Sequence, residues 1–191
     1  MSNTKLPPLP DLPMDRLVNF STTVSWGITD PQRFQQLMDE AKSLVTGGYY
    51  LGDNVFTWCR NNSALEDPAF IRALQTNVQN SSDEAIAWRR YLLACSASHA
   101  IHLNGDFVEC GVYLGTGIKT VIDYFGKDRF DKKFWGYDTF DYHPTKGHDF
   151  EEQRNGLFQK VKERFAEYSM VRLIQGLLPE SFQQGCPERI S

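Results

Sequence analysis

The residues best suited to chemistry lie in a glycine-rich turn at residues 109–117, with the sequence ECGVYLGTG. Glycines allow positive φ and let a ligand approach the backbone closely, while free amides at the start of a following helix can bind a carboxylate. The methionyl end of S-adenosylmethionine fits such a turn. We therefore expect a small ligand of the adenosyl class at this position.

A second candidate is Asp138, which ends the apolar run KKFWGYD and lies 21 positions after Gly117. An acid at the end of the second strand of a nucleotide-binding unit can accept hydrogen bonds from both ribose hydroxyls. Nicotinamide cofactors and S-adenosylmethionine share this feature. Asp138 therefore predicts an adenosine-type ligand without choosing between the two.

The spacing of the glycines separates the ligand classes further. A phosphate-binding P-loop has four residues between its glycines and then Lys-Ser/Thr, whereas Gly111 and Gly117 enclose five residues and Ile118 follows directly. A dinucleotide turn has the pattern GxGxxG, but Thr120 stands where the third glycine after Gly115 and Gly117 belongs. The P-loop interpretation fails on spacing, and the dinucleotide interpretation is weakened but stays open.

Other polar residues carry weaker signals. His143 is a weak catalytic candidate in a loop that also holds His148 and Asp149, and this loop has no recognised metal-ligand spacing, so a solvated loop is the default. Cys110 lies beside the glycine turn, but no His or Lys is placed by the sequence to lower its pKa. We expect Cys110 to fill space as a small apolar residue.

The elements that must position these residues begin at Gly105. The run DFVECGV predicts a strand, IKTVIDYFG a helix, KKFWGYD a second strand, residues 149–168 a second helix and VRLIQG a third strand. Such alternation predicts parallel strands with right-handed crossovers, whose ligands bind at the carboxyl ends. We expect an α/β, Rossmann-like domain over residues 105–191 that is truncated after its third parallel strand, with residues 188–191 able to begin a fourth.

Two segments precede this domain. Residues 1–29 begin with prolines at positions 7, 8, 10 and 13, which predicts an extended arm. Residues 30–104 predict a helical lead-in of three helices, of which the first two start at Asp30-Pro31 and Asp67-Pro68, and the third near Ser82. Gly47-Gly48 ends the first of them.

Composition restricts the class of protein. The 191 residues carry a net charge of −4 without a concentrated basic block, which argues against nucleic acid as the partner and favours a small molecule. The four cysteines show no CxxC spacing, the start of the chain has no secretory pattern, and no apolar run is long enough to span a membrane. We expect a soluble cytoplasmic protein with reduced thiols and no membrane partner.

Three segments in order, GDFVECGVYLGTG, FWGYDTFDYHP and VRLIQGLLPESF, resemble the macrocin O-methyltransferase (TylF-type) family of class I S-adenosylmethionine-dependent enzymes. The resemblance covers roughly residues 84–191 and implies a three-layer methyltransferase fold. Carried over position by position, it implies a methionyl subsite bordered by Glu109, Gly111, Tyr113 and Gly115, a ribose subsite at Asp138, and an adenine subsite in the loop from Gly176 to Ser181. Thr139 is a further residue expected to bind the cofactor.

The resemblance also implies the reaction, methyl transfer to a small hydroxylated metabolite such as a sugar or polyketide-like acceptor. Family members use a divalent cation such as Mg2+, whose ligands would lie beyond residue 191, so no metal site is assigned within this chain. Two other classes stay open. One is an NAD-dependent oxidoreductase of Rossmann fold, and the other is a non-catalytic interaction module that forms a homo-oligomer through an exposed sheet edge.

Overall fold

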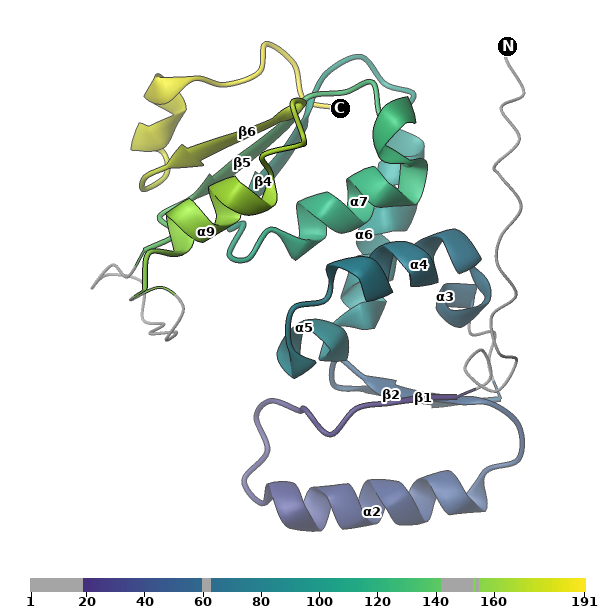
Figure 1. Cartoon of the computed structure of the whole chain (residues 1–191). Helices are drawn as coiled ribbons and strands as arrows, with labels where there is room; N and C mark the ends of the chain where they lie inside the picture. Colours follow the sequence, from purple (N-terminus) through teal and green to yellow (C-terminus); the bar gives the residue numbers. More distant parts are fainter. Residues whose placement is uncertain (1–18, 60–62, 142–152, 154) are drawn as a thin grey trace. The chain divides into compact units, whose positions relative to one another are not determined.

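The computed structural model describes residues 19–59, 63–141, 153 and 155–191. The chain forms two compact units, Met1–Tyr91 and Leu92–Ser191, drawn in Figure 1. The division falls inside helix α6 (Ala87–Ala100), so each half of this helix is described with its own unit.

The second unit is built on a three-stranded parallel sheet in the order β4-β5-β6. Its strands are β4 (Phe107–Cys110), β5 (Phe134–Asp138) and β6 (Val171–Gln175), and its helices are α7 (Thr116–Phe125), η1 (Lys127–Arg129), α9 (Leu157–Arg164) and η3 (Glu180–Gln184). In Figure 1, α7 and α9 lie over the same face of the sheet. The parallel pairing of all three predicted strands confirms a mixed α/β unit of βαβαβ order.

The core of this unit lies between the sheet and its helices. Helix α7 places Ile118, Val121 and Ile122 at helical spacing, and each of them is no more than 1% exposed. They pack with Phe134 of β5 and Val161 of α9. Burying side chains of this size contributes about 1.5–3 kcal/mol each, so this cluster fixes the helices on the sheet.

The opposite face of the sheet is covered in part by η3. Trp135, Tyr137 and Ile174 form a second buried cluster on this face. The rings of Tyr137 and Phe182 meet edge to face at 4.9 Å, and the Tyr137 hydroxyl donates to the Gly185 carbonyl at 2.8 Å. The segment after β6 therefore folds back over the sheet.

Residues at the end of the chain lie beside the other edge of β4. Asp106 and Ile190 form a parallel bridge, in which the Asp106 amide donates to the Arg189 carbonyl at 2.9 Å and the Ser191 amide donates to Asp106 at 3.1 Å. This bridge agrees with the expected start of a fourth strand. Because the connections diverge on the two sides of β4, its carboxyl end is a topological switch point, where open α/β sheets bind ligands.

The first unit combines helices with a sheet that the sequence analysis missed. Its elements are β1 (Asn19–Ser21), α2 (Pro31–Leu44), β2 (Tyr49–Gly52), β3 (Val55–Trp58), α3 (Ser63–Glu66), α4 (Pro68–Asn77) and α5 (Ser81–Ala85). Strand β2 pairs with β1 in parallel and with β3 antiparallel. Asp53 and Asn54 have φ values of 50° and 57°, which suit a two-residue hairpin turn. The lead-in is therefore not purely helical, and the predicted arm includes β1.

The helix starts agree with the cap signals in the sequence. Asp30 accepts a hydrogen bond from the Arg33 amide, and Asp67 accepts from the amides of Ala69 and Phe70, with proline at the first helical position in both cases. The predicted third helix is instead two helices, α5 and α6, with a break at Ile86. Within the helix predicted over residues 149–168, Gln153 is helical and α9 covers Leu157–Arg164 after Gly156, whose φ is +68°. Residues 149–152 and 154 lie outside the described residues.

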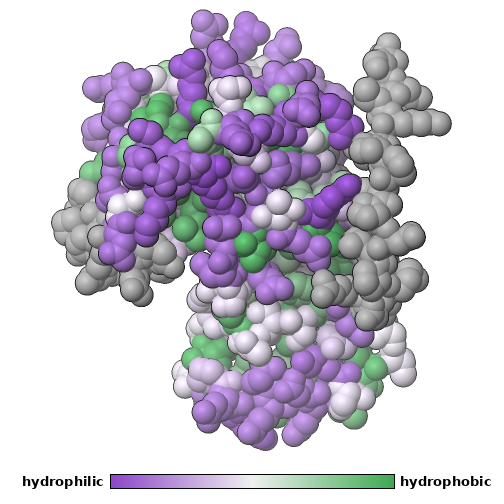
Figure 2. Space-filling model, viewed as in Figure 1, coloured by the Kyte–Doolittle hydropathy of each residue, from purple (hydrophilic) through white to green (hydrophobic). Residues whose placement is uncertain are grey.

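Helix α2 contains no buried residue, and Leu44 at its end is 82% exposed. The side of the first unit seen in Figure 2 carries mainly hydrophilic residues at its lower end, where Figure 1 places this helix. The helix predicted to start at Asp30-Pro31 is therefore confirmed, but it has no buried face. No helix in the described part of the chain is long and apolar enough to cross a membrane.

Gly136 in β5 tests the packing of the second unit. A Cβ atom at this position would lie 2.9 Å from both Ile118 Cδ1 and Val112 Cγ2 and 3.1 Å from Leu173 Cδ2. Alanine normally suits a strand better than glycine, but here we expect Gly136→Ala to lower the free energy of unfolding by about 1–3 kcal/mol through overpacking. Urea denaturation measures this loss. Cys110→Ala, at an exposed position of β4, is the control, and equal stability of both variants and the wild type would contradict the packing.

Candidate functional site

The predicted ligand-binding residues gather at the carboxyl end of the parallel sheet. Glu109 lies in β4, and the turn to α7 follows it directly, while Asp138 ends β5. Gly176 follows β6 and leads to Ser181 in η3. Since the carboxyl ends of parallel strands meet at one edge, the topology brings these residues to the same side of the unit.

The glycine turn contains three left-handed residues between β4 and α7. Gly111, Tyr113 and Gly115 have φ values of 93°, 49° and 78°. The Gly111 amide donates to the Tyr137 carbonyl at 2.8 Å, and the Gly115 amide donates to the Val112 carbonyl at 2.8 Å. A positive φ is uncommon for a tyrosine and costs conformational energy. The surrounding structure must therefore hold Tyr113 in place.

The two outer glycines serve different purposes. A Cβ atom on Gly111 would have no atom within 4 Å, whereas a Cβ atom on Gly115 would overlap the ring of Phe165. Gly115 is therefore required by internal packing as well as by its φ. Gly111 borders open space, which is the property expected of a glycine that a ligand approaches.

The carboxylate of Asp138 joins the glycine turn to the end of β5. One of its oxygens accepts from the Tyr113 amide at 2.8 Å, and the other accepts from the Phe140 amide at 2.8 Å. Asp138 is only 7% exposed. Asp138 was predicted to bind a ribose, and its geometry gives it a positioning role as well. A carboxylate has about four lone-pair sites, and the Thr139 hydroxyl also lies 3.5 Å from Asp138 Oδ1.

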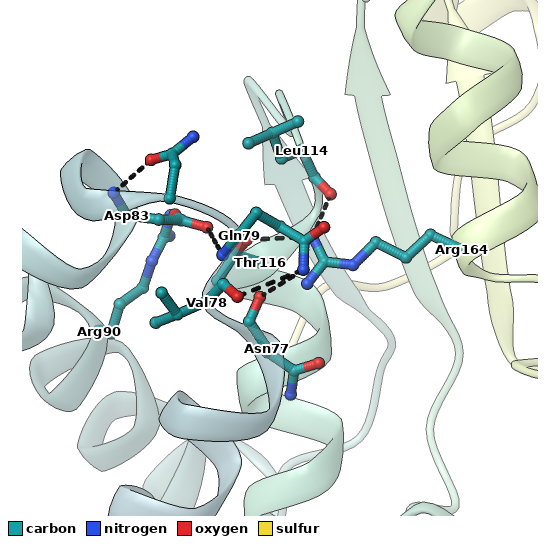
Figure 3. Close-up of polar contacts among 9 residues, drawn as sticks. Asn77, Val78, Gln79, Asp83, Arg90, Leu114, Thr116 and Arg164 are labelled. Carbon is teal, nitrogen blue, oxygen red and sulfur yellow. Dashed lines mark hydrogen bonds and ion pairs between the residues drawn. The ribbon is translucent and has the colours of Figure 1, made fainter.

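Helix α9 holds the turn from another direction. Figure 3 shows the Arg164 guanidinium reaching the Leu114 carbonyl, at 2.6 Å from Nη1, and the Thr116 hydroxyl, at 3.1 Å. Sequence reasoning missed Arg164, because nothing in the pattern of α9 distinguishes it from an exposed basic residue. Its contacts span about fifty positions of sequence and follow only from the tertiary fold.

The polar contacts of Gln175 were also missed by sequence reasoning. The side-chain amide of Gln175, the last residue of β6, donates to the Thr139 carbonyl at 3.1 Å and to Asp141 Oδ2 at 2.7 Å. The Thr139 hydroxyl donates to the Asp141 carbonyl at 3.2 Å. Asp141 Oδ1 is buried and has no hydrogen-bond partner among the described residues. Thr139, predicted to bind the cofactor, is therefore part of a network that ends in an unsatisfied acceptor.

The loop after β6 contributes a second unsatisfied atom. The Gly176 amide donates to the Asp138 carbonyl at 2.9 Å, which ties this loop to the end of β5. Ser181 is 2% exposed, and its hydroxyl has no hydrogen-bond partner among the described residues. A Cβ atom on Gly176 would lie 2.9 Å from Ser181 Cβ. Gly176 and Ser181, predicted to lie near an adenine, therefore pack against each other.

Among the described residues of this unit, three ionisable groups have shifted pKa values. Burial, followed by the thiols of Cys186 and Cys110, raises the pKa of Tyr137. Burial, followed by Asp123, raises the pKa of Tyr168 to about 12. Burial is also the main cause of a lowered pKa at Lys119. Both phenols therefore stay protonated at neutral pH, and neither serves as a base there.

Two other sequence predictions have a different outcome. His143, the weak catalytic candidate, lies outside the described residues, as do His148 and Asp149. Cys110 is exposed at the end of β4, so the expectation that it fills buried space is wrong. Among the described residues, no group of three or more His, Cys, Asp or Glu side chains could hold a metal ion.

Comparison of the chain with family models, curated proteins and solved structures found no match in any of the three. The geometry of the site therefore has to support the functional argument.

The different roles of the two glycines can be measured. We expect Gly111→Ala to lower the free energy of unfolding by about 1–2 kcal/mol, the cost of a left-handed residue with a side chain. Gly115→Ala should cost about 1–3 kcal/mol more, because its methyl group also overlaps Phe165. The double variant Gly115→Ala/Phe165→Leu should recover part of this additional loss. Equal losses at the two glycines in chemical denaturation would contradict this assignment.

Arg164 can be tested as a support of the turn. Arg164→Met keeps most of the apolar stem but leaves the Leu114 carbonyl without this donor, so we expect a loss of about 1–3 kcal/mol in unfolding free energy. Lys160→Met, on the same helix, is the matched control and should change stability by less than about 0.5 kcal/mol. Amide hydrogen exchange should show faster exchange at residues 113–116 in Arg164→Met only. Unchanged exchange there would exclude the supporting role.

Proposed function

We propose that the second unit binds S-adenosylmethionine at the carboxyl end of its sheet and belongs to an O-methyltransferase that acts on a small hydroxylated metabolite. The observation that carries this proposal is the left-handed glycine turn, open at Gly111 and bonded through the Tyr113 amide to Asp138. Together with the resemblance of three ordered segments to the TylF-type family, this geometry favours an adenosyl ligand with a carboxylate.

The turn suits the methionyl part of the ligand. Gly111 leaves space where any other residue would place a side chain, so the ligand can approach the backbone. Gly115 provides no side-chain cap to the ten-residue helix α7, and the positive end of a helix dipole favours a carboxylate. These features support a bound carboxylate next to the first turn of α7.

The polar groups after β5 and β6 suit the adenosine part. Asp138 places a carboxylate at the end of β5, and a ribose offers two hydroxyl donors of the kind that a carboxylate accepts. The buried Asp141 Oδ1 and Ser181 Oγ lack partners among the described residues, and buried polar atoms are normally hydrogen-bonded. A ligand with several donors and acceptors would satisfy such atoms.

S-adenosylmethionine, when bound, would supply the methyl group that passes to the acceptor oxygen, while the S–CH3 bond breaks to leave a thioether and the hydroxyl proton goes to water. The residues of this chain would act by binding and orientation: the first turn of α7 would hold the ligand carboxylate, and Asp138 would fix the turn while accepting from the ribose. Holding two reactants in a productive orientation removes much of the entropic barrier to such a transfer. An acceptor of the sugar or polyketide type is the expectation that the resemblance adds.

Calorimetric titration of the whole chain with S-adenosylmethionine, and separately with NAD, tests the proposal. We expect S-adenosylmethionine to bind and NAD not to bind, and Asp138→Asn to weaken binding by about 1–3 kcal/mol, as expected for lost hydrogen bonds to a charged acceptor. Asp128→Asn, an exposed residue of η1, is the control and should bind like the wild type.

Because Asp138 also holds the turn, thermal unfolding must show that Asp138→Asn is folded at the titration temperature. Ser181→Ala provides a second variant, which leaves the turn intact and should weaken the binding of S-adenosylmethionine. Tighter binding of NAD than of S-adenosylmethionine would favour an oxidoreductase. If folded wild-type protein binds neither compound, the cofactor assignment is wrong.

A further inference from the structure

The first unit contains a cavity of about 670 Å³ that the proposed function does not use. The described residues that line it come from β1, β2, α3, α4 and α5, with Val78 and Ala87 beside them. Pockets of about 300–1,000 Å³ are the size that holds drug-sized organic molecules. None of its lining residues belongs to the ligand site of the second unit.

The cavity has an apolar floor and a polar rim. Among the lining residues, Tyr50 and Phe70 are each 1% exposed, and Leu65 is 6% exposed. The exposed lining residues are polar: Asn19, Ser21, Gln75 and Glu84. A ligand would therefore place a flat apolar body against the floor and a polar group at the rim.

The floor is fixed by contacts within the first unit. The rings of Phe20 and Tyr50 stack at 5.0 Å with an interplanar angle of 11°. The Tyr50 hydroxyl accepts from the Trp88 amide at 2.9 Å, and Phe70 packs edge to face on Tyr91 at 5.0 Å. The aromatic residues at the floor are therefore held in place before any ligand arrives, which lowers the cost of binding.

The rim carries one negative charge. Glu84 is the only charged side chain among the described residues that line the cavity, and its carboxylate has no hydrogen-bond or ion-pair partner in the described part of the chain. The neighbouring Asp83 is engaged elsewhere, because its carboxylate accepts from the Gln79 amide and pairs with Arg90 (Figure 3). Glu84 is therefore available to a ligand.

A basic group that contacts the rim is already paired. Lys42 donates to the Ser21 hydroxyl at 3.1 Å, but its ammonium also pairs with Asp39 at 2.7 Å. The pair contributes no net charge, and among the described residues that line the cavity Glu84 alone is charged. A cation is attracted to such an opening, and an anion is repelled.

We propose that this cavity binds a small organic cation, an amine attached to an aromatic or similarly flat apolar body. The apolar body lies on the floor formed by Tyr50, Phe70 and Leu65, and the ammonium group lies at the rim next to Glu84. This site is independent of the S-adenosylmethionine site, so the failure of either proposal leaves the other standing.

Three probes of the same shape and different charge test the proposal: 2-naphthylmethylammonium, 2-naphthylmethanol and 2-naphthoate. Ligand-observed NMR titration of the whole chain at neutral pH gives the affinity of each probe. We expect the ammonium to bind most tightly and the naphthoate least tightly. Binding of naphthoate as tight as that of the ammonium, or no saturable binding of the ammonium, overturns the proposal.

Two variants locate the bound probe. Glu84→Gln removes the charge at an exposed position. We expect this change to lower the affinity for the ammonium probe about two- to fivefold, the range of a solvent-exposed ion pair, and to leave the affinity for the neutral alcohol unchanged. Ala64→Leu adds bulk at a buried lining residue and should weaken all three probes. Glu40→Gln, an exposed change in α2, is the matched control.

The test remains decisive even if Ala64→Leu does not fold, because Glu84→Gln changes an exposed residue and should fold like the wild type. If Glu84→Gln lowers the affinity for the ammonium probe no more than Glu40→Gln does, the assigned contact at the rim is wrong. If folded Ala64→Leu binds every probe like the wild type, the probes bind outside the cavity and the proposal is overturned.

Discussion

The hydrogen bond from the Tyr113 amide to the Asp138 carboxylate is the contact on which the candidate ligand site depends. It links a turn that follows β4 to the end of β5, across 25 positions of sequence. Without this acceptor, Tyr113 would have little reason to keep its left-handed conformation. The same carboxylate accepts from the Phe140 amide, which fixes the path of the chain as it leaves β5. One buried side chain thus shapes both loops at the centre of the sheet edge.

Helix α9 completes what Asp138 begins. Phe165 occupies the space in which Gly115 would otherwise place a side chain, and Arg164 binds the carbonyl of Leu114 between the left-handed residues. The turn is therefore held from the strand side by a carboxylate and from the helix side by a ring and a guanidinium. A ligand that binds to such a turn does not have to order it first. Glycine is required at position 115 because a side chain there would overlap Phe165. At position 111 glycine is favoured by its positive φ and by the space that we propose the ligand occupies.

The sequence predicted the parts of the fold that follow from local patterns. The three strands of the second unit, their order along the chain and the caps at Asp30 and Asp67 all come from short-range signals, namely apolar runs, glycine turns and proline at the first helical position. The hairpin around Asp53 was missed because its turn residues were not recognised as suited to left-handed conformations. The contacts of Arg164 and Gln175 were beyond reach for another reason: each joins residues more than thirty positions apart, and no local pattern encodes the partner.

The hydrogen bonds of a residue indicate its role better than its type and position in the sequence do. Asp138 stands where an adenosine-binding acid is expected, yet its two closest donors are backbone amides of the protein. A carboxylate that only held the turn would be satisfied by these bonds, and nearby polar atoms would be satisfied as well. Asp141 Oδ1 and Ser181 Oγ are buried without partners among the described residues, although folding alone penalises such atoms by about 1–3 kcal/mol each. These two atoms lie in the segments that follow β5 and β6, and a polar ligand at this edge would satisfy them. The candidate binding site therefore depends on these polar groups as well as on the turn.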